Sequence, residues 1–153
     1  QAARAFNGTP YFLLVPMLVG SKELRDALLQ DPSTRDVSTR WERISYACVG
    51  IGAVPPVEGQ IVYIGQENLS DLIEREAVGD ICARYFNFQG KFLDAEFNGR
   101  LLGVSLDHLR RAKNVLAVAV GIEKSKAVRG ALCSRLITHL FVDEALAQVL
   151  LQE

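Results

Sequence analysis

The chain has 153 residues, of which 49% are hydrophobic and 23% charged, and its formal net charge is -1. This size and composition predict one α/β-sized domain with a sizeable core. The near-neutral charge argues against a nucleic-acid-binding surface, which would carry a basic excess or stripe. The longest apolar run, residues 11–20, contains Pro16 and is too short to span a bilayer. We therefore expect a cytoplasmic protein without membrane contact.

Cysteine and histidine are sparse. Cys48, Cys82 and Cys133 are odd in number, lack CxxC spacing and lie in apolar stretches, so we expect small buried hydrophobic residues. The sequence places neither His108 nor His139 near a cysteine, and two scattered histidines do not form a metal site. The sequence thus predicts no thiol active site, metal or cofactor.

The N-terminal third contains helix and strand signals in alternation. Ser21 is a suitable N-cap, and Asp31-Pro32 is a typical helix start. The expected elements are the end of a helix in residues 1–6, a strand over Tyr11 to Pro16, a helix over Lys22 to Leu29, and a second helix that carries Val37 and Trp41. Since the chain opens inside helical sequence without methionine, we expect it to start within a larger protein.

A glycine pair follows the next expected strand, Arg43 to Val49. Gly50-Ile51-Gly52 could suggest a dinucleotide-binding fingerprint, but Pro55-Pro56 stands where the helix should begin. The Rossmann interpretation fails at that point. The two glycines most simply provide a tight turn, and a backbone without side chains could also admit a ligand closely.

The middle of the chain is less regular. Its expected elements are a loop or short strand over residues 59–65 flanking the pocket, a polar helix over 68–77, an aromatic strand over 81–88, a Gln89-Gly90 turn with an outgoing segment through Leu93, and a short strand over 100–104.

The last third reads as repeated strand and helix units. Ser105 caps a helix over 106–112, strands follow over 114–120 and 138–142, and a helix runs over 143–151. Strands that alternate with helices predict an α/β fold with a mainly parallel sheet and helices on both faces.

Two lysines occupy an unusual place in this last third. Gly121 ends the apolar strand, and Lys124 and Lys126 fall in the first turn of the helix that follows. A helix N-terminus is partly positive, so cations there are disfavoured unless an anion visits the site. The alternative is that both lysines are solvated surface residues offset by Glu123.

Several ordered segments resemble the effector-binding domain of SorC-type bacterial transcriptional regulators over essentially the whole chain. The pairing of an Ala-Val-Gly-Asp element with a Gly-x-x-Lys element is the most specific part of the resemblance. The segments are Leu14-Val15-Pro16, Val49-Gly50-Ile51-Gly52, Ala77-Val78-Gly79-Asp80-Ile81, Asn98-Gly99-Arg100-Leu101-Leu102-Gly103-Val104, Val118-Ala119-Val120-Gly121-Ile122-Glu123-Lys124 and Val142-Asp143-Glu144.

The resemblance implies a sensor of a phosphorylated sugar, linked to a helix-turn-helix that binds an operator. It also implies the fold shared with sugar-phosphate isomerases and glucosamine-6-phosphate deaminase, and a homo-oligomer, either dimer or tetramer. By motif, Asp80 would accept hydrogen bonds from sugar hydroxyls and Lys124 would approach the charged end of the ligand. The remaining residues expected at the ligand are Gly50, Gly52, Cys82 and Gly121.

Simple physics allows other roles for the acidic residues. Asp80 begins a mainly apolar strand, where a carboxylate needs solvent or a polar partner such as a sugar, but it could equally cap the preceding helix. Asp143 and Glu144 begin the last helix, and N-capping explains both of them without a ligand.

The chain departs from the family pattern at several points. Val142 stands where the family usually has threonine, and Val120-Gly121 replaces a glycine pair, which would narrow the pocket. The family's Gly-Thr-Thr-type phosphate loop does not precede Tyr11. We therefore expect residues 1–153 to be a partial C-terminal effector-binding domain, with the DNA-binding domain outside them.

Two other functions stay open. In a sugar-phosphate isomerase or deaminase, Asp80 would be the general base and Lys124 would hold phosphate, but neither His108 nor His139 is a convincing second acid. Alternatively the segment mediates assembly, because the last helix carries an apolar stripe that could pack on its own sheet or on another subunit: Ala145, Leu146, Val149, Leu150 and Leu151.

Overall fold

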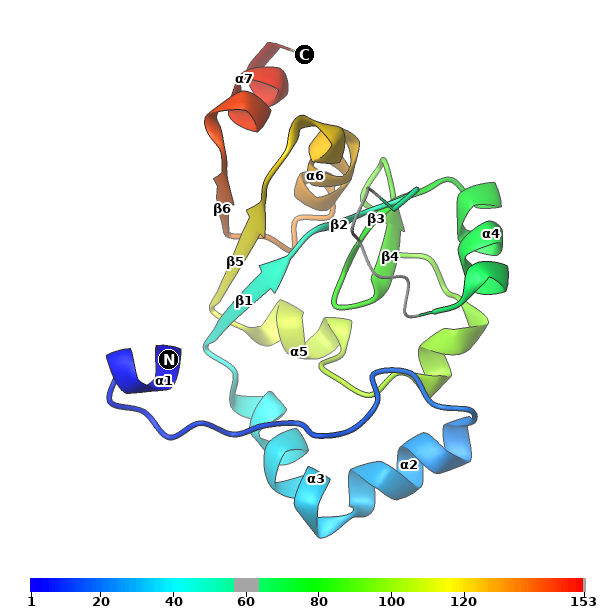
Figure 1. Cartoon of the computed structure of the whole chain (residues 1–153), viewed down its shortest axis with the longest axis vertical. Coiled ribbons are helices and arrows are strands. Elements are labelled where there is room, and N and C mark those ends of the chain that lie inside the picture. The colour runs from blue at the N-terminus through cyan, green and yellow to red at the C-terminus, as the bar shows by residue number, and fades with distance from the viewer. Residues whose placement is uncertain (57–63, 153) are drawn as a thin grey trace.

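The structure is a computed structural model that describes residues 1–56 and 64–152. Its strands form two three-stranded sheets, one parallel with the order β1-β5-β6 and one antiparallel with the order β2-β3-β4. Figure 1 shows helices arranged around these sheets, with α6 between the two sheets and α7 beyond the end of β6. The α/β class and the parallel sheet predicted from the sequence are confirmed.

The parallel sheet consists of β1 (Tyr46–Gly50), β5 (Asn114–Ala119) and β6 (His139–Val142). Gly50 pairs with Val118, and Ala119 pairs with Val142. These strands match the predicted ones, except that β1 starts three residues late. The 3₁₀ helix η1 (Thr39–Arg43) precedes it and carries Trp41.

The two faces of the parallel sheet differ. Small and branched side chains on one face join a core with three helices, α5 (Leu106–Arg111), α6 (Ser125–Cys133) and α7 (Glu144–Gln152). On the other face Tyr46, Val118 and Phe141 are 67%, 49% and 53% exposed. Parallel sheets are usually covered on both faces, whereas the described residues bury only one face of this sheet.

The antiparallel sheet consists of β2 (Gly52–Ala53), β3 (Ala77–Ile81) and β4 (Arg84–Asn87). The single strand predicted over 81–88 is wrong, because the chain reverses at Cys82-Ala83, where φ is 52° and 58°. Two-residue hairpins with positive φ normally use Asn or Gly, so this turn carries no familiar sequence signal. The next turn is confirmed: the Gly90 N–H donates to the Asn87 carbonyl at 2.9 Å.

The predicted helix starts are confirmed at three caps. Ser21 Oγ accepts the Leu24 N–H at the start of α2 (Lys22–Gln30), and an Asp31 carboxylate oxygen accepts the Ser33 N–H at the start of α3 (Pro32–Ser38). Ser105 caps α5 in the same way. The helix predicted over 68–77 is α4 (Gln66–Glu74), and Ala77 already belongs to β3.

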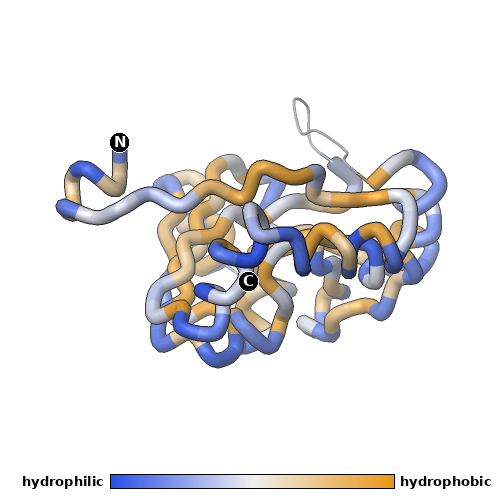
Figure 2. Tube along the Cα trace, turned by 90° about the horizontal axis from the view of Figure 1, so that it is seen from below, coloured by the Kyte–Doolittle hydropathy of each residue, from blue (hydrophilic) through white to orange (hydrophobic). Residues whose placement is uncertain are grey.

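Two predicted strands are absent from the described residues. Residues 11–16 and 100–104 form no strand. A single antiparallel bridge pairs Leu101 with Leu18, which follows the first of these segments. The 3₁₀ helix η2 (Glu96–Arg100) takes in the first residue of the second predicted strand, and the chain begins with the short helix α1 (Ala2–Ala5). Figure 2 shows the hydrophobic N-terminal stretch running along the surface, where Phe12 and Leu14 are 68% and 88% exposed. The segment predicted over 59–65 lies largely outside the described residues.

The prediction of buried cysteines is wrong. All three cysteines are exposed: Cys48 lies on the uncovered face of β1, Cys82 in the hairpin turn and Cys133 at the end of α6. Apolar sequence neighbours do not bury a residue whose own side chain points outward. Among the described residues, none of the helices is long and apolar enough to cross a membrane.

Candidate functional site

The two sheets meet at the carboxyl end of β1. The chain leaves β1 at Gly50, passes through Ile51 and enters β2 at Gly52. The Ile51 N–H donates to the Val118 carbonyl at 3.2 Å, so the parallel sheet continues one step beyond its last strand residue. Open α/β sheets place ligands at the carboxyl ends of their strands. Gly50 and Gly52 therefore flank the position where a ligand site is expected.

Lys124 reaches this junction from β5. It ends the 3₁₀ helix η3 (Ile122–Lys124) just before α6, and its half-buried ammonium donates to the Ile51 carbonyl at 2.9 Å. Lys126 is exposed. The interpretation as a solvated surface residue thus fits Lys126, whereas Lys124 is turned toward the protein.

Gly121 provides the turn between β5 and η3. Its φ is 99°, a conformation that residues with a Cβ rarely adopt, and its N–H donates to an Asp143 carboxylate oxygen at 2.6 Å. The other oxygen of Asp143 accepts the Leu146 N–H at 2.9 Å. These two bonds, the Leu146 bond first, lower the pKa of Asp143. The capping interpretation of Asp143 is confirmed, and Asp143 also connects α7 to the lysine-bearing segment.

Asp80 faces the same junction from the second sheet. It pairs with Gly52 across β2 and β3, and its half-buried carboxylate accepts the Ala83 N–H at 2.9 Å. Burial raises the pKa of Asp80, although the Ala83 N–H and the Lys124 charge both oppose that shift. Asp80 does not cap a helix, because α4 ends at Glu74. Its local backbone contact holds the hairpin turn instead.

Cys82 lies in that turn, two residues after Asp80. Its residue surface is exposed, yet partial desolvation of the thiol and then the nearby Asp80 charge raise the pKa of Cys82. A raised pKa keeps the sulfur protonated at neutral pH, and a thiol is a poor nucleophile. Cys82 therefore presents a neutral thiol beside Asp80.

A pocket of about 350 Å³ opens beside the Lys124 segment. Its lining includes Glu123 and Ser125, which flank Lys124 in the sequence, and Ala53 and Val78 from the antiparallel sheet. Its remaining lining residues are Val54, Pro55, Pro56, Lys126 and Ala127. Neither Lys124 nor Asp80 lines this pocket; Lys124 and Gly52 are sequence neighbours of residues that do.

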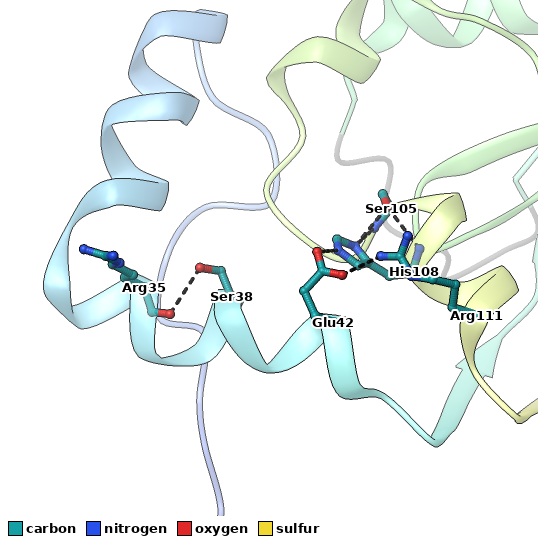
Figure 3. A network of polar contacts seen from close by, with 6 residues as sticks. All are labelled: Arg35, Ser38, Glu42, Ser105, His108 and Arg111. Atoms are coloured by element: carbon teal, nitrogen blue, oxygen red, sulfur yellow. Dashed lines mark hydrogen bonds and ion pairs between the residues drawn. The ribbon is translucent and has the colours of Figure 1, made fainter.

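The two histidines lie elsewhere. Figure 3 shows that His108 bridges α5 and η1: its Nδ1 accepts the Ser105 N–H at 3.0 Å, and its Nε2 lies 3.1 Å from a Glu42 carboxylate oxygen. Arg111 donates to the other oxygen of Glu42 at 2.8 Å. His139 is exposed on β6 and contacts Thr138. His108 completes a helix cap, so both of its ring nitrogens already have structural partners.

No metal centre accompanies this arrangement in the part of the chain that the structure describes. Across residues 1–56 and 64–152, no group of three or more His, Cys, Asp or Glu residues could hold a metal ion. Lys124, Asp80 and the nearby backbone can supply hydrogen bonds and charge to a ligand.

Comparison with known proteins agrees with this geometry. Residues 1–152 match the family model described as "Putative sugar-binding domain". The chain belongs to the sugar-binding domain family of SorC-type transcriptional regulators. It is 30% identical over 153 residues to the sorbitol operon regulator of Klebsiella pneumoniae, and this alignment covers 99% of the chain and 49% of that protein. It is 34% identical over 141 residues to the transcriptional regulator LsrR of Enterobacter sp. (strain 638), covering 89% of this chain and 44% of LsrR.

Solved structures of this family have the same fold. The full-length sorbitol operon regulator SorC from Klebsiella pneumoniae superposes with a TM-score of 0.91 at 28% identity, over 98% of this chain and 49% of that chain. A transcriptional regulator from Streptococcus pneumoniae TIGR4 gives 0.82 at 25% identity, over 99% of this chain and 58% of that chain. The chain thus spans about half the length of the curated relatives it matches.

Two features of the candidate site have no signal in the sequence. The Ile51 carbonyl is the hydrogen-bond partner of Lys124, and Tyr85 stands opposite Asp80 on the neighbouring strand. A carbonyl group has no sequence signal of its own. Tyr85 could have been found only from the hairpin register, which depends on the unpredicted turn at Cys82-Ala83.

Proposed function

We propose that this SorC-type domain senses a phosphorylated sugar and thereby controls operator binding by a helix-turn-helix domain outside these 153 residues. The regulator would act in the cytoplasm as a homo-oligomer, a dimer or tetramer. The site would be bordered by Asp80 and Lys124, with Gly50, Gly52, Cys82 and Gly121 beside the ligand.

The position of Lys124 carries this proposal. Its ammonium donates to a carbonyl group, 2.9 Å away, at the carboxyl end of β1, and no carboxylate among the described residues forms an ion pair with it. A lysine ammonium has three donors, so two remain for an anion such as phosphate. Asp80 borders the same junction, and a carboxylate suits sugar hydroxyls. One cationic and one acidic group at a strand edge together fit a ligand with a phosphate at one end and hydroxyls at the other.

Control of DNA binding would follow from differential affinity. A sugar phosphate can shift the regulator between two arrangements only by the difference in its binding free energy for them, typically about 1–3 kcal/mol. Gly121 and Asp143 offer a route from the site, because their hydrogen bond connects the Lys124 segment to α7. The names of the relatives support a regulatory role, and they give no support to enzymatic turnover.

The test is thermal unfolding of the full-length regulator with sugar phosphates and with the same sugars unphosphorylated. A ligand at about a hundred times its dissociation constant should stabilise the protein by about 2.7 kcal/mol, a clear rise in melting temperature. Lys124→Ala should abolish the phosphate-dependent part of the rise, whereas Lys113→Ala, at an exposed lysine away from the candidate site, should retain it. Equal rises with and without phosphate would contradict the proposal.

A further inference from the structure

Three residues form a row across the antiparallel sheet. Gly52 pairs with Asp80, and Asp80 pairs with Tyr85, so one row runs through β2, β3 and β4. Directly opposed residues on antiparallel strands share a face, with Cβ atoms about 4.5–5.5 Å apart. Gly52 contributes no side chain to this row. Within this row, Tyr85 is therefore the residue whose side chain can lie beside the Asp80 carboxylate.

The ring of Tyr85 is held in place by the core. It lies edge-on to Phe97, with ring centroids 5.9 Å apart and an interplanar angle of 85°, and Phe97 is 1% exposed. A fixed aromatic ring can present its hydroxyl with little loss of side-chain entropy. Tyr85 would thus lose little further side-chain freedom if its hydroxyl bound a ligand.

The hydroxyl of Tyr85 has no hydrogen-bond partner among the residues that the structure describes. A tyrosine hydroxyl in a half-buried side chain normally finds a partner. Burial, and secondly the charge of Asp80, raise the pKa of Tyr85, so the hydroxyl stays protonated and can donate at neutral pH. The influence of Asp80 on this pKa also agrees with the register that places the two side chains together.

We infer that the Tyr85 hydroxyl is a specificity-determining group of the sugar site. It binds either the sugar hydroxyl that Asp80 binds or the hydroxyl next to it. This inference rests on the proposed function. Ionised Asp80 can only accept hydrogen bonds, whereas Tyr85 can donate as well. One sugar hydroxyl can then donate to Asp80 while it accepts from Tyr85. The ligand class is a sugar phosphate that carries free hydroxyls at the end away from its phosphate.

The experiment measures affinity by titration calorimetry on the full-length regulator. The ligands are ribose 5-phosphate, glucose 6-phosphate and sorbitol 6-phosphate, with 2-deoxyribose 5-phosphate and 2-deoxyglucose 6-phosphate as partners that lack one hydroxyl. The variants are Tyr85→Phe, which keeps the ring against Phe97, and Asp80→Asn. Tyr46→Phe is the matched control, because Tyr46 is 67% exposed on the other sheet.

We expect Tyr85→Phe to weaken the best-bound sugar phosphate about tenfold, with an unchanged melting temperature in the absence of ligand. Discrimination between that sugar and an analogue lacking the contacted hydroxyl should shrink to the same extent. If Asp80→Asn weakens binding and Tyr85→Phe does not, the inference is wrong and the proposed function stands. An equal loss for every sugar and its deoxy partner would also overturn it. If wild-type protein binds none of the five compounds, both the inference and the proposed function are contradicted for these sugars.

Discussion

The two sheets of this domain obtain their order in different ways. The parallel sheet is built from strand and helix units with local caps, and its buried face packs on α5, α6 and α7. The antiparallel sheet has a two-residue strand, a hairpin turn with two positive φ values, and close glycine contacts with α6. The parallel sheet thus tolerates change at its carboxyl edge, whereas the antiparallel sheet depends on a few exact contacts. Since Asp80 lies on the antiparallel sheet, those contacts also position half of the candidate site.

The largest expected effect comes from Phe86, which connects the two sheets. Its side chain on β4 is fully buried, and its ring centroid lies 5.6 Å from that of Phe92. The same side chain belongs to the core that covers the parallel sheet. Phe86→Ala should lower the free energy of unfolding by about 3–5 kcal/mol. Phe88→Ala, at a residue that is 44% exposed, should cost less than about 1 kcal/mol. Denaturant unfolding measures both, and equal losses would contradict the role of Phe86.

The second effect compares glycines in the two sheets. A Cβ at Gly79 would lie 2.6 Å from the Gly52 carbonyl oxygen and 2.8 Å from the Ala127 Cβ, where β3 packs on α6. Gly79→Ala should therefore cost about 1–3 kcal/mol of stability. A Cβ at Gly50 would meet no atom within 4 Å, so Gly50→Ala should change stability by less than about 0.5 kcal/mol. Chemical denaturation of the two variants measures both changes. A Gly79→Ala variant as stable as wild type would contradict the close packing of β3 on α6.

The third effect concerns the hairpin turn. Cys82 has a φ of 52°, a left-handed conformation that costs most residues about 1–2 kcal/mol but that asparagine adopts more readily. Cys82→Asn should therefore raise the free energy of unfolding by about 1 kcal/mol. Cys48→Asn, in the extended strand β1, should bring no such gain. Thermal unfolding of both variants checks the turn, and a destabilised Cys82→Asn would show that the turn is built differently.

The smallest effect is the acid sensitivity of Asp143. Its pKa is lowered in the folded protein, so the fold favours the ionised carboxylate. The resulting stability is present above the ordinary pKa of aspartate and is lost as the pH falls through the lowered value. Asp143→Asn should be less stable than wild type at about pH 7, and the difference should narrow by about pH 3. Melting temperatures across this range test it, with exposed Asp94→Asn as control. A difference that is constant with pH would contradict the assignment.

The sequence predicts the helix starts and the strands of the parallel sheet well, because the signals for these elements are local. The caps at Ser21, Asp31 and Ser105 and the strand that ends before Gly121 are all where the residues indicate. The hairpin at Cys82-Ala83 was missed, since neither residue type marks such a turn. The strand predicted at residues 11–16 is absent because an apolar stretch forms a strand only when it has a partner to pair with.

The candidate site follows the same division. The motif at Lys124 and the glycines of residues 50–52 could be located from the sequence, and the structure places them at one strand edge. The contact of Lys124 with the Ile51 carbonyl and the register of Asp80 with Tyr85 depend on pairing between distant segments. Such pairing is set by tertiary packing, and no local pattern encodes it.

The most direct test of the sugar-phosphate assignment is calorimetric titration of one sugar in phosphorylated and unphosphorylated form. Wild type, Lys124→Ala and Asp80→Asn would be compared in the full-length regulator. We predict that Lys124→Ala abolishes the preference for the phosphorylated form, and that Asp80→Asn weakens both forms about tenfold while the preference remains. A preference for phosphate that survives Lys124→Ala would contradict the assignment of Lys124 to the charged end of the ligand.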